Sequence, residues 1–140
     1  MKTPEKEAKR WFSQAEDDLR FVTWVRKEGL FFDKGCFISQ QAGEKALKAC
    51  LYATGRRHVI GHSLFEMIRE LSTIDETFRP LADLAKRLDR FYIPTRYPNG
   101  LPGGSPFEVY TKEDLDSAYG DVNKLCATCR NFLDKKEAST

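Results

Sequence analysis

Two side chains with the potential for phosphate chemistry lie in the turn GRRHVIGHSL, residues 55–64. Arg57 and His62 suit RNA cleavage, because an imidazole can act as general base on a ribose hydroxyl while a guanidinium stabilises the phosphorane. Ser63 is a typical helix N-cap residue, and the positive end of the helix after it favours the neutral imidazole that a base needs. The same turn also suits a structural role in which His62 bonds to backbone groups, so both interpretations stay open.

A second candidate site is the segment FYIPTRYPNG, residues 91–100, where Arg96 and Tyr97 stand between two prolines. An arginine beside a tyrosine can bind a phosphate and stack on a base. The prolines disfavour helical backbone and stiffen the segment, which lowers the entropy cost of holding a long side chain in place. Alternatively, Arg96 pairs with a carboxylate such as Glu44 while the tyrosines fasten the segment to the protein. We expect an internal brace that also borders the binding surface.

The third candidate is a set of polar side chains on one predicted helix: Gln40, Gln41, Glu44, Lys45 and Lys48. Glu44 and Lys48 are one helical turn apart, in the order that favours an ion pair. The spacing alone favours an exposed, solvated stripe. The same helix is otherwise apolar enough to be central, so a polar cluster that faces inward or contacts a partner is the alternative.

The four cysteines show no metal-binding pattern. Cys126 and Cys129 have CxxC spacing, whereas Cys36 and Cys50 lie far from them without a second such motif. Free cysteines are among the most buried residues, and the cytosol keeps thiols reduced. We therefore predict buried, reduced thiols, no metal site and no cofactor. The chain also lacks a glycine-rich phosphate loop and an HExxH motif.

Helical spacing of apolar residues predicts the elements that position these candidates. The predicted helices span about 4–27, 33–54, 64–72 and 78–92, with a last helix that starts after Thr111. Residues 93–110 are rich in proline and glycine and form a long loop, and residues 134–140 form a polar, frayed tail. FEVY, residues 107–110, is too short and isolated to be a convincing strand. The sequence predicts an all-α, up-and-down bundle of four main helices plus a short helix.

The length of 140 residues and the hydrophobic content of 41% predict a single globular domain over residues 1–140. The formal net charge of +2 is too small to attract nucleic acid through overall charge, so such binding needs a local basic patch. No apolar run reaches the roughly 18 residues that span a membrane, and MKTPEKEAKRW lacks the apolar core of a secretory signal. We therefore expect a cytoplasmic protein.

The segments WFSQAEDDL, CFISQQAGEKALKACLYATG, GHSL and YIPTRYPNG follow one another in this order. Together they resemble the HEPN family, named for higher eukaryotes and prokaryotes nucleotide binding, over about Lys6 to Phe132. The similarity is to the branch with a T-R-Y-P-D type segment, which includes the C-terminal domain of sacsin. The resemblance implies a helical bundle, usually a homodimer, that associates with nucleotides, RNA or a partner minimal nucleotidyltransferase. By position it implies these polar hallmark residues: Gln41, Glu44, Lys45, Lys48, His62, Arg96 and Tyr97.

Two departures from the family pattern bear on function. Asn99 stands where the segment usually has aspartate, which removes a negative charge beside Arg96. Nuclease members resemble one another in an arginine followed four to six residues later by a histidine, on a helix in the C-terminal half. Here both histidines precede Ser63, and only Arg57 and His62 have that spacing. The departure argues against the usual ribonuclease of this family.

We therefore expect a non-catalytic helical module that forms a homodimer and binds a nucleotide, a nucleic-acid phosphate or a nucleotidyltransferase partner. Lys48, Arg57, His62 and Arg96 would supply its positive lining. A metal-independent, toxin-like ribonuclease that uses Arg57 or Arg96 with His62 is the first alternative. A purely structural dimerisation domain is the second.

Overall fold

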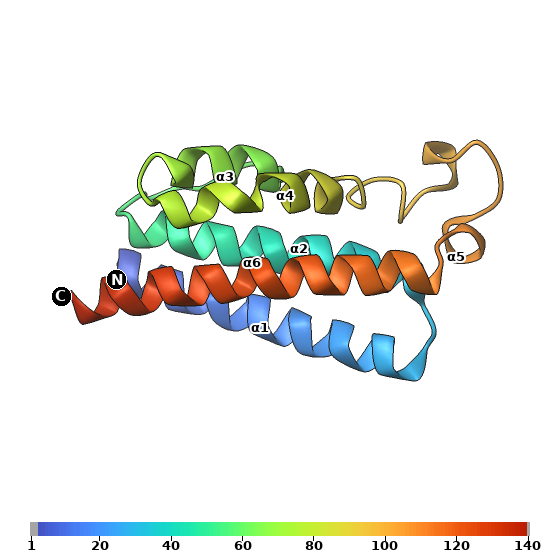
Figure 1. Cartoon of the computed structure of the whole chain (residues 1–140), viewed down its shortest axis with the longest axis horizontal. Helices are drawn as coiled ribbons and strands as arrows, with labels where there is room; N and C mark the ends of the chain where they lie inside the picture. The colour runs from blue at the N-terminus through green and yellow to red at the C-terminus, as the bar shows by residue number, and fades with distance from the viewer. Residues whose placement is uncertain (1–2, 140) are drawn as a thin grey trace.

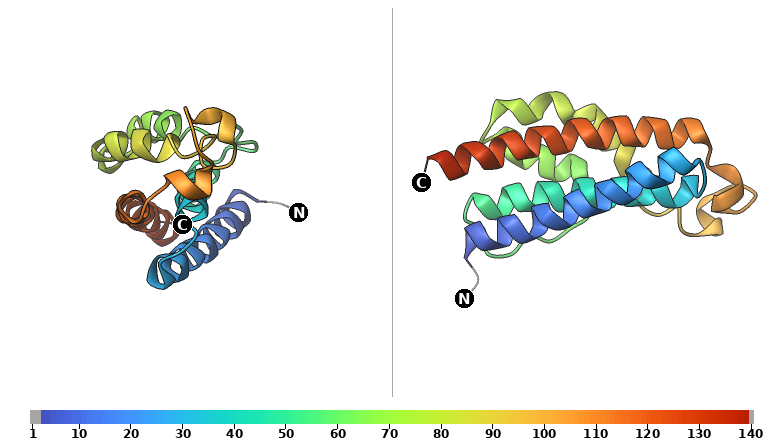
Figure 2. Two further views of the ribbon diagram at one scale, coloured as in Figure 1. Left: turned by 90° about the vertical axis from the view of Figure 1, so that its right-hand side faces the viewer. Right: turned by 90° about the horizontal axis from the view of Figure 1, so that it is seen from below.

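The structure, a computed structural model, describes residues 3–139 and contains no strand within that range. Its α-helices are α1 (Pro4–Glu28), α2 (Phe32–Ala53), α3 (Leu64–Ser72), α4 (Ala82–Asp89), α5 (Pro106–Val109) and α6 (Lys112–Ala138), and its 3-10 helices are η1 (Glu76–Leu81) and η2 (Pro98–Gly100). The long helices α1, α2 and α6 run side by side, and α3 and α4 form a shorter pair that packs on α2 and α6 (Figures 1 and 2). The predicted all-α bundle is confirmed.

The central position of α2 depends on two of its glycines. A Cβ at Gly35 would lie only 2.6 Å from Leu115 Cδ1, and one at Gly43 only 2.8 Å from Leu64 Cδ2. Contacts this close are possible only because glycine has no side chain. Side chains of α6 and α3 therefore pack directly on the backbone of α2, which also contacts α1, α4 and α5.

The predicted helix starts at Leu64 and after Thr111 are confirmed by their caps. Ser63 Oγ accepts a hydrogen bond from the backbone nitrogen of Glu66 at 3.1 Å, and Thr111 Oγ1 accepts one from Asp114 at 3.3 Å. Each bond satisfies a backbone donor that the first helical turn leaves free.

Three predicted boundaries are wrong. The fourth helix begins as 3-10 helix at Glu76, because Pro80 removes a backbone donor, and α4 ends at Asp89. The FEVY segment contributes to the short helix α5 instead of an irregular loop. Residues 134–138 continue α6 and do not form a frayed tail; Lys135 and Lys136 in the last turn complement the negative helix end.

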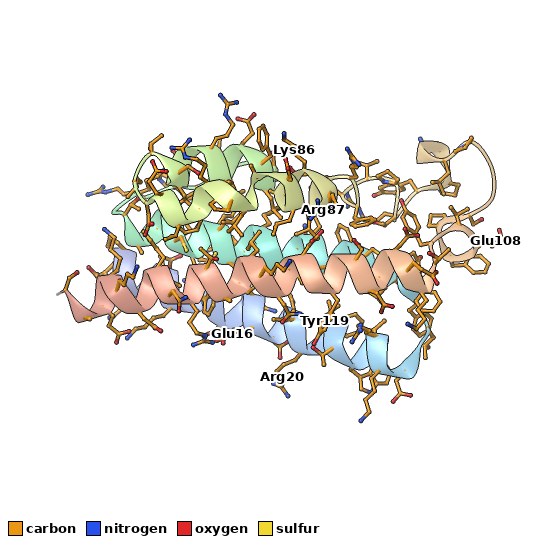
Figure 3. All side chains as sticks on the ribbon, viewed as in Figure 1. Glu16, Arg20, Lys86, Arg87, Glu108 and Tyr119 are labelled. Atoms are coloured by element: carbon orange, nitrogen blue, oxygen red, sulfur yellow. The ribbon has the colours of Figure 1, made fainter. Side chains whose placement is uncertain are left out.

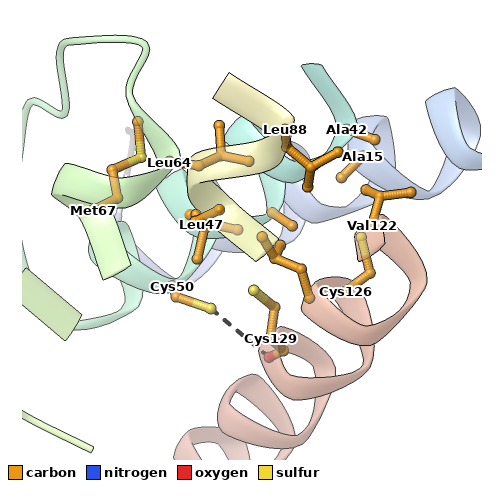
Figure 4. Packing of buried hydrophobic residues seen from close by; sticks show 14 of the residues in the cluster. Ala15, Ala42, Leu47, Cys50, Leu64, Met67, Leu88, Val122, Cys126 and Cys129 are labelled. Atoms are coloured by element: carbon orange, nitrogen blue, oxygen red, sulfur yellow. Dashed lines mark hydrogen bonds between the residues drawn. The ribbon is translucent and has the colours of Figure 1, made fainter. Parts of the chain in front are cut away.

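The core lies between the helices and contains all four cysteines as buried free thiols, as predicted. Cys50 Sγ lies 3.8 Å from the carbonyl oxygen of Cys129, close to Cys126 (Figure 4). Burial raises the pKa of the Cys36 and Cys126 thiols well above the usual range, because the charged form loses its hydration. These thiols are therefore inert at neutral pH.

Polar contacts join the layers at the surface. Arg87 of α4 donates two bonds to the Asp121 carboxylate of α6, at 2.9 and 3.0 Å. The hydroxyls of Thr23 and Tyr119 lie 3.0 Å apart between α1 and α6; Arg87 and Tyr119 are labelled in Figure 3. Within residues 3–139 no helix has the length and apolar character needed to cross a membrane.

Candidate functional site

Polar side chains of α2 form a cluster around Glu44 that faces inward. The interpretation as an inward-facing cluster is therefore correct, and the interpretation as an exposed, solvated stripe is wrong. Glu44 is only 5% exposed. Its carboxylate lies 3.1 Å from Lys48 Nζ, and Gln41 Nε2 donates to it at 3.4 Å. His62 Nδ1 lies 3.3 Å from both carboxylate oxygens. The structure thus brings four predicted residues together.

Hydrogen bonds from α2 also hold the backbone of the turn that carries His62. Gln40 Nε2 donates to the His62 carbonyl oxygen at 2.9 Å, and Gln41 Nε2 donates to Gln40 Oε1 at 2.8 Å. Gln40 is fully buried, so these bonds satisfy an amide that burial would otherwise leave without partners. Helix α2 therefore holds His62 at two points: Gln40 binds its backbone carbonyl, and Glu44 contacts its ring.

The expected influence of the α3 N-terminus on His62 is not what the structure shows. The backbone nitrogens of Leu64 and Phe65 donate to the Asp89 carboxylate at 2.8 and 3.1 Å, and Ser63 Oγ donates to it at 3.0 Å. A carboxylate already occupies the positive helix end. The imidazole instead faces Glu44, so its local electrostatics depend on α2.

A continuous stack of side chains leads from His62 to the proline-rich segment. The His62 and Tyr92 rings are stacked with centroids 4.8 Å apart and an interplanar angle of 20°. Arg96 Cζ lies 4.6 Å from the ring centroids of both Tyr92 and Phe37, and 5.3 Å from that of Tyr97. We call His62, Tyr92 and Arg96 the His62–Arg96 ladder. The imidazole is 59% exposed, and Arg96 is exposed, so both ends of the ladder reach solvent.

Arg96 does not pair with Glu44, so the alternative of an Arg96–Glu44 pair is wrong. Its Nε donates to the Tyr92 carbonyl oxygen at 2.8 Å, and no carboxylate of residues 3–139 forms an ion pair with it. The Tyr92 ring contacts both the guanidinium and His62, while the Glu44 carboxylate already binds Lys48. Arg96 is braced by aromatic rings and a carbonyl, neither of which neutralises its charge.

Lys45 and Lys48 do not line the exposed surface of the ladder. Lys48 is 6% exposed and bound to Glu44, so its expected place in the positive lining is wrong. Lys45 Nζ lies 2.5 Å from Asp18 and borders a separate open depression of about 820 Å³ beside Trp11. Arg57 is exposed in the turn and makes no hydrogen bond or ion pair within residues 3–139.

Two residues were missed from the sequence as members of the site: Phe37 and Tyr92. Phe37 shares helical spacing with Gln41 and Glu44, so its place on the face of α2 that carries the cluster was detectable in principle. Tyr92 had no such signal as a link between His62 and Arg96, because these two neighbours come from different segments of the chain.

Two side chains of the ladder, Arg96 and His62, have hydrogen-bonding groups at the surface that no residue among 3–139 uses. Arg96 uses Nε for a backbone bond, which leaves the terminal amino groups of its planar guanidinium for the oxygens of an anion such as a phosphate. His62 directs Nδ1 at Glu44, and no bond to Nε2 is formed by residues 3–139. No group of His, Cys, Asp or Glu in the described range is arranged to hold a metal ion.

Comparisons with known proteins agree with this architecture. The HEPN domain model matches residues 8–132. A protein of Methanocaldococcus jannaschii named "Putative toxin MJ1304" is 32% identical over 139 residues, which cover 94% of this chain and 91% of that protein. The crystal structure of TT1696 from Thermus thermophilus superimposes with a TM-score of 0.81 at 33% identity and covers 92% of this chain and 97% of its own.

A further similar crystal structure is that of ST0689, described as an archaeal HEPN homologue. It has a TM-score of 0.74 at 28% identity and covers 95% of this chain and 99% of its own. The family model and the relatives span nearly the whole bundle, including α2, the His62 turn and the proline-rich segment. The chain therefore belongs to the HEPN domain family.

Proposed function

We propose that this HEPN domain is a non-catalytic module that binds phosphate groups of nucleotides or nucleic acids at the His62–Arg96 ladder. The observation that carries the proposal is that Arg96 is held on three aromatic rings without a carboxylate partner among residues 3–139. A guanidinium that is fixed, exposed and not neutralised is suited to bind an anion with little further loss of entropy.

The neighbours of Arg96 suggest how a nucleotide would be bound. Tyr97 is 51% exposed, so its ring offers a face for a base while the guanidinium binds a phosphate. His62 lies at the other end of the ladder and can donate a hydrogen bond to a second phosphate oxygen. Arg57, exposed in the same turn as His62, extends the positive charge toward a longer ligand.

Fluorescence anisotropy with a labelled single-stranded RNA, and competition by a nucleotide, tests the proposal. Affinity should fall as salt concentration rises, because binding releases counterions. Arg96→Ala should weaken binding at least about tenfold, and Arg96→Lys should restore it only in part, because lysine lacks the planar fork. Arg79→Ala is the matched control, since Arg79 is exposed on η1 and paired with Glu76. Salt-independent binding, or equal losses in the two alanine variants, contradicts the proposal.

A ribonuclease is the second candidate, because the geometry of His62 favours it. A buried carboxylate beside Nδ1 can orient an imidazole so that Nε2 faces the substrate as general base. Arg57 or Arg96 would then stabilise the phosphorane. The name of the M. jannaschii relative, a toxin, also favours this candidate. Incubation of RNA with the wild type and with His62→Ala decides: equal cleavage removes His62 from the mechanism, and no cleavage by either leaves only binding.

The proposal extends to the finer family assignment and to a protein partner. The segment from Thr95 to Pro98 supports membership of the T-R-Y-P-D branch, and Thr95 Oγ1 donates to the Phe91 carbonyl oxygen at 2.5 Å, which shapes that loop.

We also propose that the protein lies in the cytoplasm and that its protein partner is a minimal nucleotidyltransferase. Affinity purification of the tagged chain from its own cells, followed by mass spectrometry, should recover a small nucleotidyltransferase; its absence counts against this partner.

A further inference from the structure

Two cationic side chains from neighbouring helices lie over one aromatic ring on the α3–α4 pair. Arg69 Cζ of α3 lies 5.7 Å from the centroid of the Phe65 ring, and Lys86 Nζ of α4 lies 4.9 Å from it. Arg90 caps α4 one helical turn after Lys86, so it follows Lys86 on the same side of the helix. In Figure 3 Lys86 lies on the side of α4 that faces away from α6, whereas Arg87 turns toward α6. We call Phe65, Arg69, Lys86 and Arg90 the Phe65 platform.

The positive charges of the platform are only weakly neutralised. The guanidinium groups of Arg69 and Arg90 form no hydrogen bond or ion pair with any residue from 3 to 139. Lys86 Nζ lies 3.7 Å from Asp83, whose side chain is 84% exposed, and an exposed pair of this kind contributes little. Glu66 is also exposed and makes no ion pair with these cations. Because the two cations over the ring repel each other, the binding of an external anion between them is favourable.

The platform holds its cations in the same way as the ladder holds Arg96. In both places an aromatic ring orients a side chain without neutralising its charge. The Phe65 ring has cations over it from two helices, so it is not free to stack on a base. The platform is therefore suited to the phosphate groups of a ligand and not to its bases. Contacts to phosphates hold a nucleic acid in place without reading its sequence.

Asp89 joins the platform to the His62–Arg96 ladder. Its carboxylate accepts hydrogen bonds from Ser63 Oγ at 3.0 Å and from the backbone nitrogen of Phe65 at 3.1 Å. His62 of the ladder directly precedes Ser63, and Arg90 of the platform directly follows Asp89. Three residue steps separate His62 from Phe65, so their Cα atoms are at most about 11 Å apart. The α3 N-terminus satisfies the one carboxylate at this junction, which leaves the path between the two sites positive.

We propose that the Phe65 platform is a second phosphate site, which takes the sugar–phosphate backbone of a nucleic-acid single strand that also lies on the ladder. The inference rests on the proposed function, because the platform extends the ladder. A mononucleotide carries its phosphates at one end and cannot occupy both sites at once, whereas a strand carries a phosphate at every nucleotide. The strand is single because a base that stacks on Tyr97 must be unpaired. The platform shares no residue with the polar hallmark set that the family resemblance implies.

Fluorescence anisotropy of the full chain with labelled single-stranded RNAs of about two and about eight nucleotides tests the platform. The wild type should bind the longer RNA at least about tenfold more tightly, with a steeper salt dependence, because more counterions are released. Arg69→Gln/Lys86→Gln should remove most of this gain and leave the affinity for the short RNA unchanged. The matched control is Arg20→Gln/Lys27→Gln, which removes the same charge from exposed positions on α1 and should change neither affinity by more than about twofold.

The outcomes separate a failure of the platform from a failure of the ladder. Equal affinity for the two lengths, or equal effects of the platform and control variants, overturns the platform; the ladder proposal then stands if Arg96→Ala still weakens binding. Long-RNA binding that depends on the platform but is unchanged in Arg96→Ala overturns the proposed function together with the shared strand. A polyglutamate peptide that displaces the long RNA as well as an unlabelled RNA of equal charge does overturns the assignment to nucleic acid, and the platform is then a site for an acidic protein segment.

Discussion

The position of Arg96 on aromatic rings decides what this side chain can do. Pairing with Glu44 would have neutralised it, but Glu44 already binds Lys48 and faces His62. The rings instead fix the plane of the guanidinium and leave its charge intact. Cation–π contacts of this kind contribute about 0.5–1 kcal/mol each when exposed. They are therefore strong enough to orient Arg96, and they leave its amino groups available to bind a phosphate.

Tyr92 is expected to act through its ring and not through its hydroxyl. Tyr92→Phe retains both ring faces, so its affinity for single-stranded RNA should equal that of the wild type. Tyr92→Leu removes the stacking partner of His62 and Arg96 and should weaken binding about threefold to tenfold, since both side chains lose their orientation. Anisotropy titrations of the two variants at one salt concentration measure the difference. Equal loss in both would mean that the hydroxyl, and not the ring, is what matters.

The buried pair of Glu44 and Lys48 makes a second prediction at the residue scale. Glu44→Leu leaves Lys48 buried without a counter-charge, which should lower the free energy of unfolding by about 3 kcal/mol or more. The double variant Glu44→Leu/Lys48→Met removes both charges and should recover most of that loss. Urea unfolding followed by circular dichroism measures both values. A double variant as unstable as the single one would show that the cost does not come from the unpaired lysine.

At the scale of the elements, helix caps and apolar spacing predicted α1, α2, α3 and the start of α6 nearly to the residue. The helical spacing of Gln41, Glu44 and Lys48 also predicted that they share a face. It did not show which way the face turns, because the exposed stripe and the inward cluster have the same spacing. The link through Tyr92 depends on how α4 and the loop after it pack on α2. Such long-range packing leaves no local pattern in the sequence.

The close packing of α6 on α2 gives a prediction at the element scale. Gly35→Ala places a Cβ against Leu115 and should lower the free energy of unfolding by about 1–3 kcal/mol. Gly120→Ala is the matched control, since Gly120 lies within α6 with no atom within 4 Å of the added carbon. This change should stabilise the protein by about 0.5–1 kcal/mol, because alanine favours helix more than glycine does. Thermal and urea unfolding of the two variants should therefore shift in opposite directions, and a parallel shift would contradict the packing.

At the scale of the whole molecule, the two proposed sites use different elements and share one junction. The His62–Arg96 ladder joins α2 to the segments before α3 and after α4, whereas the Phe65 platform belongs to α3 and α4. The junction is the Asp89 carboxylate, which binds the start of α3. A strand that contacts both sites therefore depends on how α3 is fastened to the end of α4.

This junction predicts that one strand, and not two, occupies the ladder and the platform of a chain. Once a strand is bound at one site, its contact with the other is intramolecular, and the high effective concentration excludes a second strand. Isothermal titration calorimetry with an RNA of about eight nucleotides should therefore give one strand per chain. Arg96→Ala and Arg69→Gln/Lys86→Gln should each weaken the affinity and leave this ratio unchanged, because the remaining site still holds the same strand. Two strands per chain in the wild type, falling to one in each variant, would mean that the two sites bind separate molecules and that the junction at Asp89 does not join them.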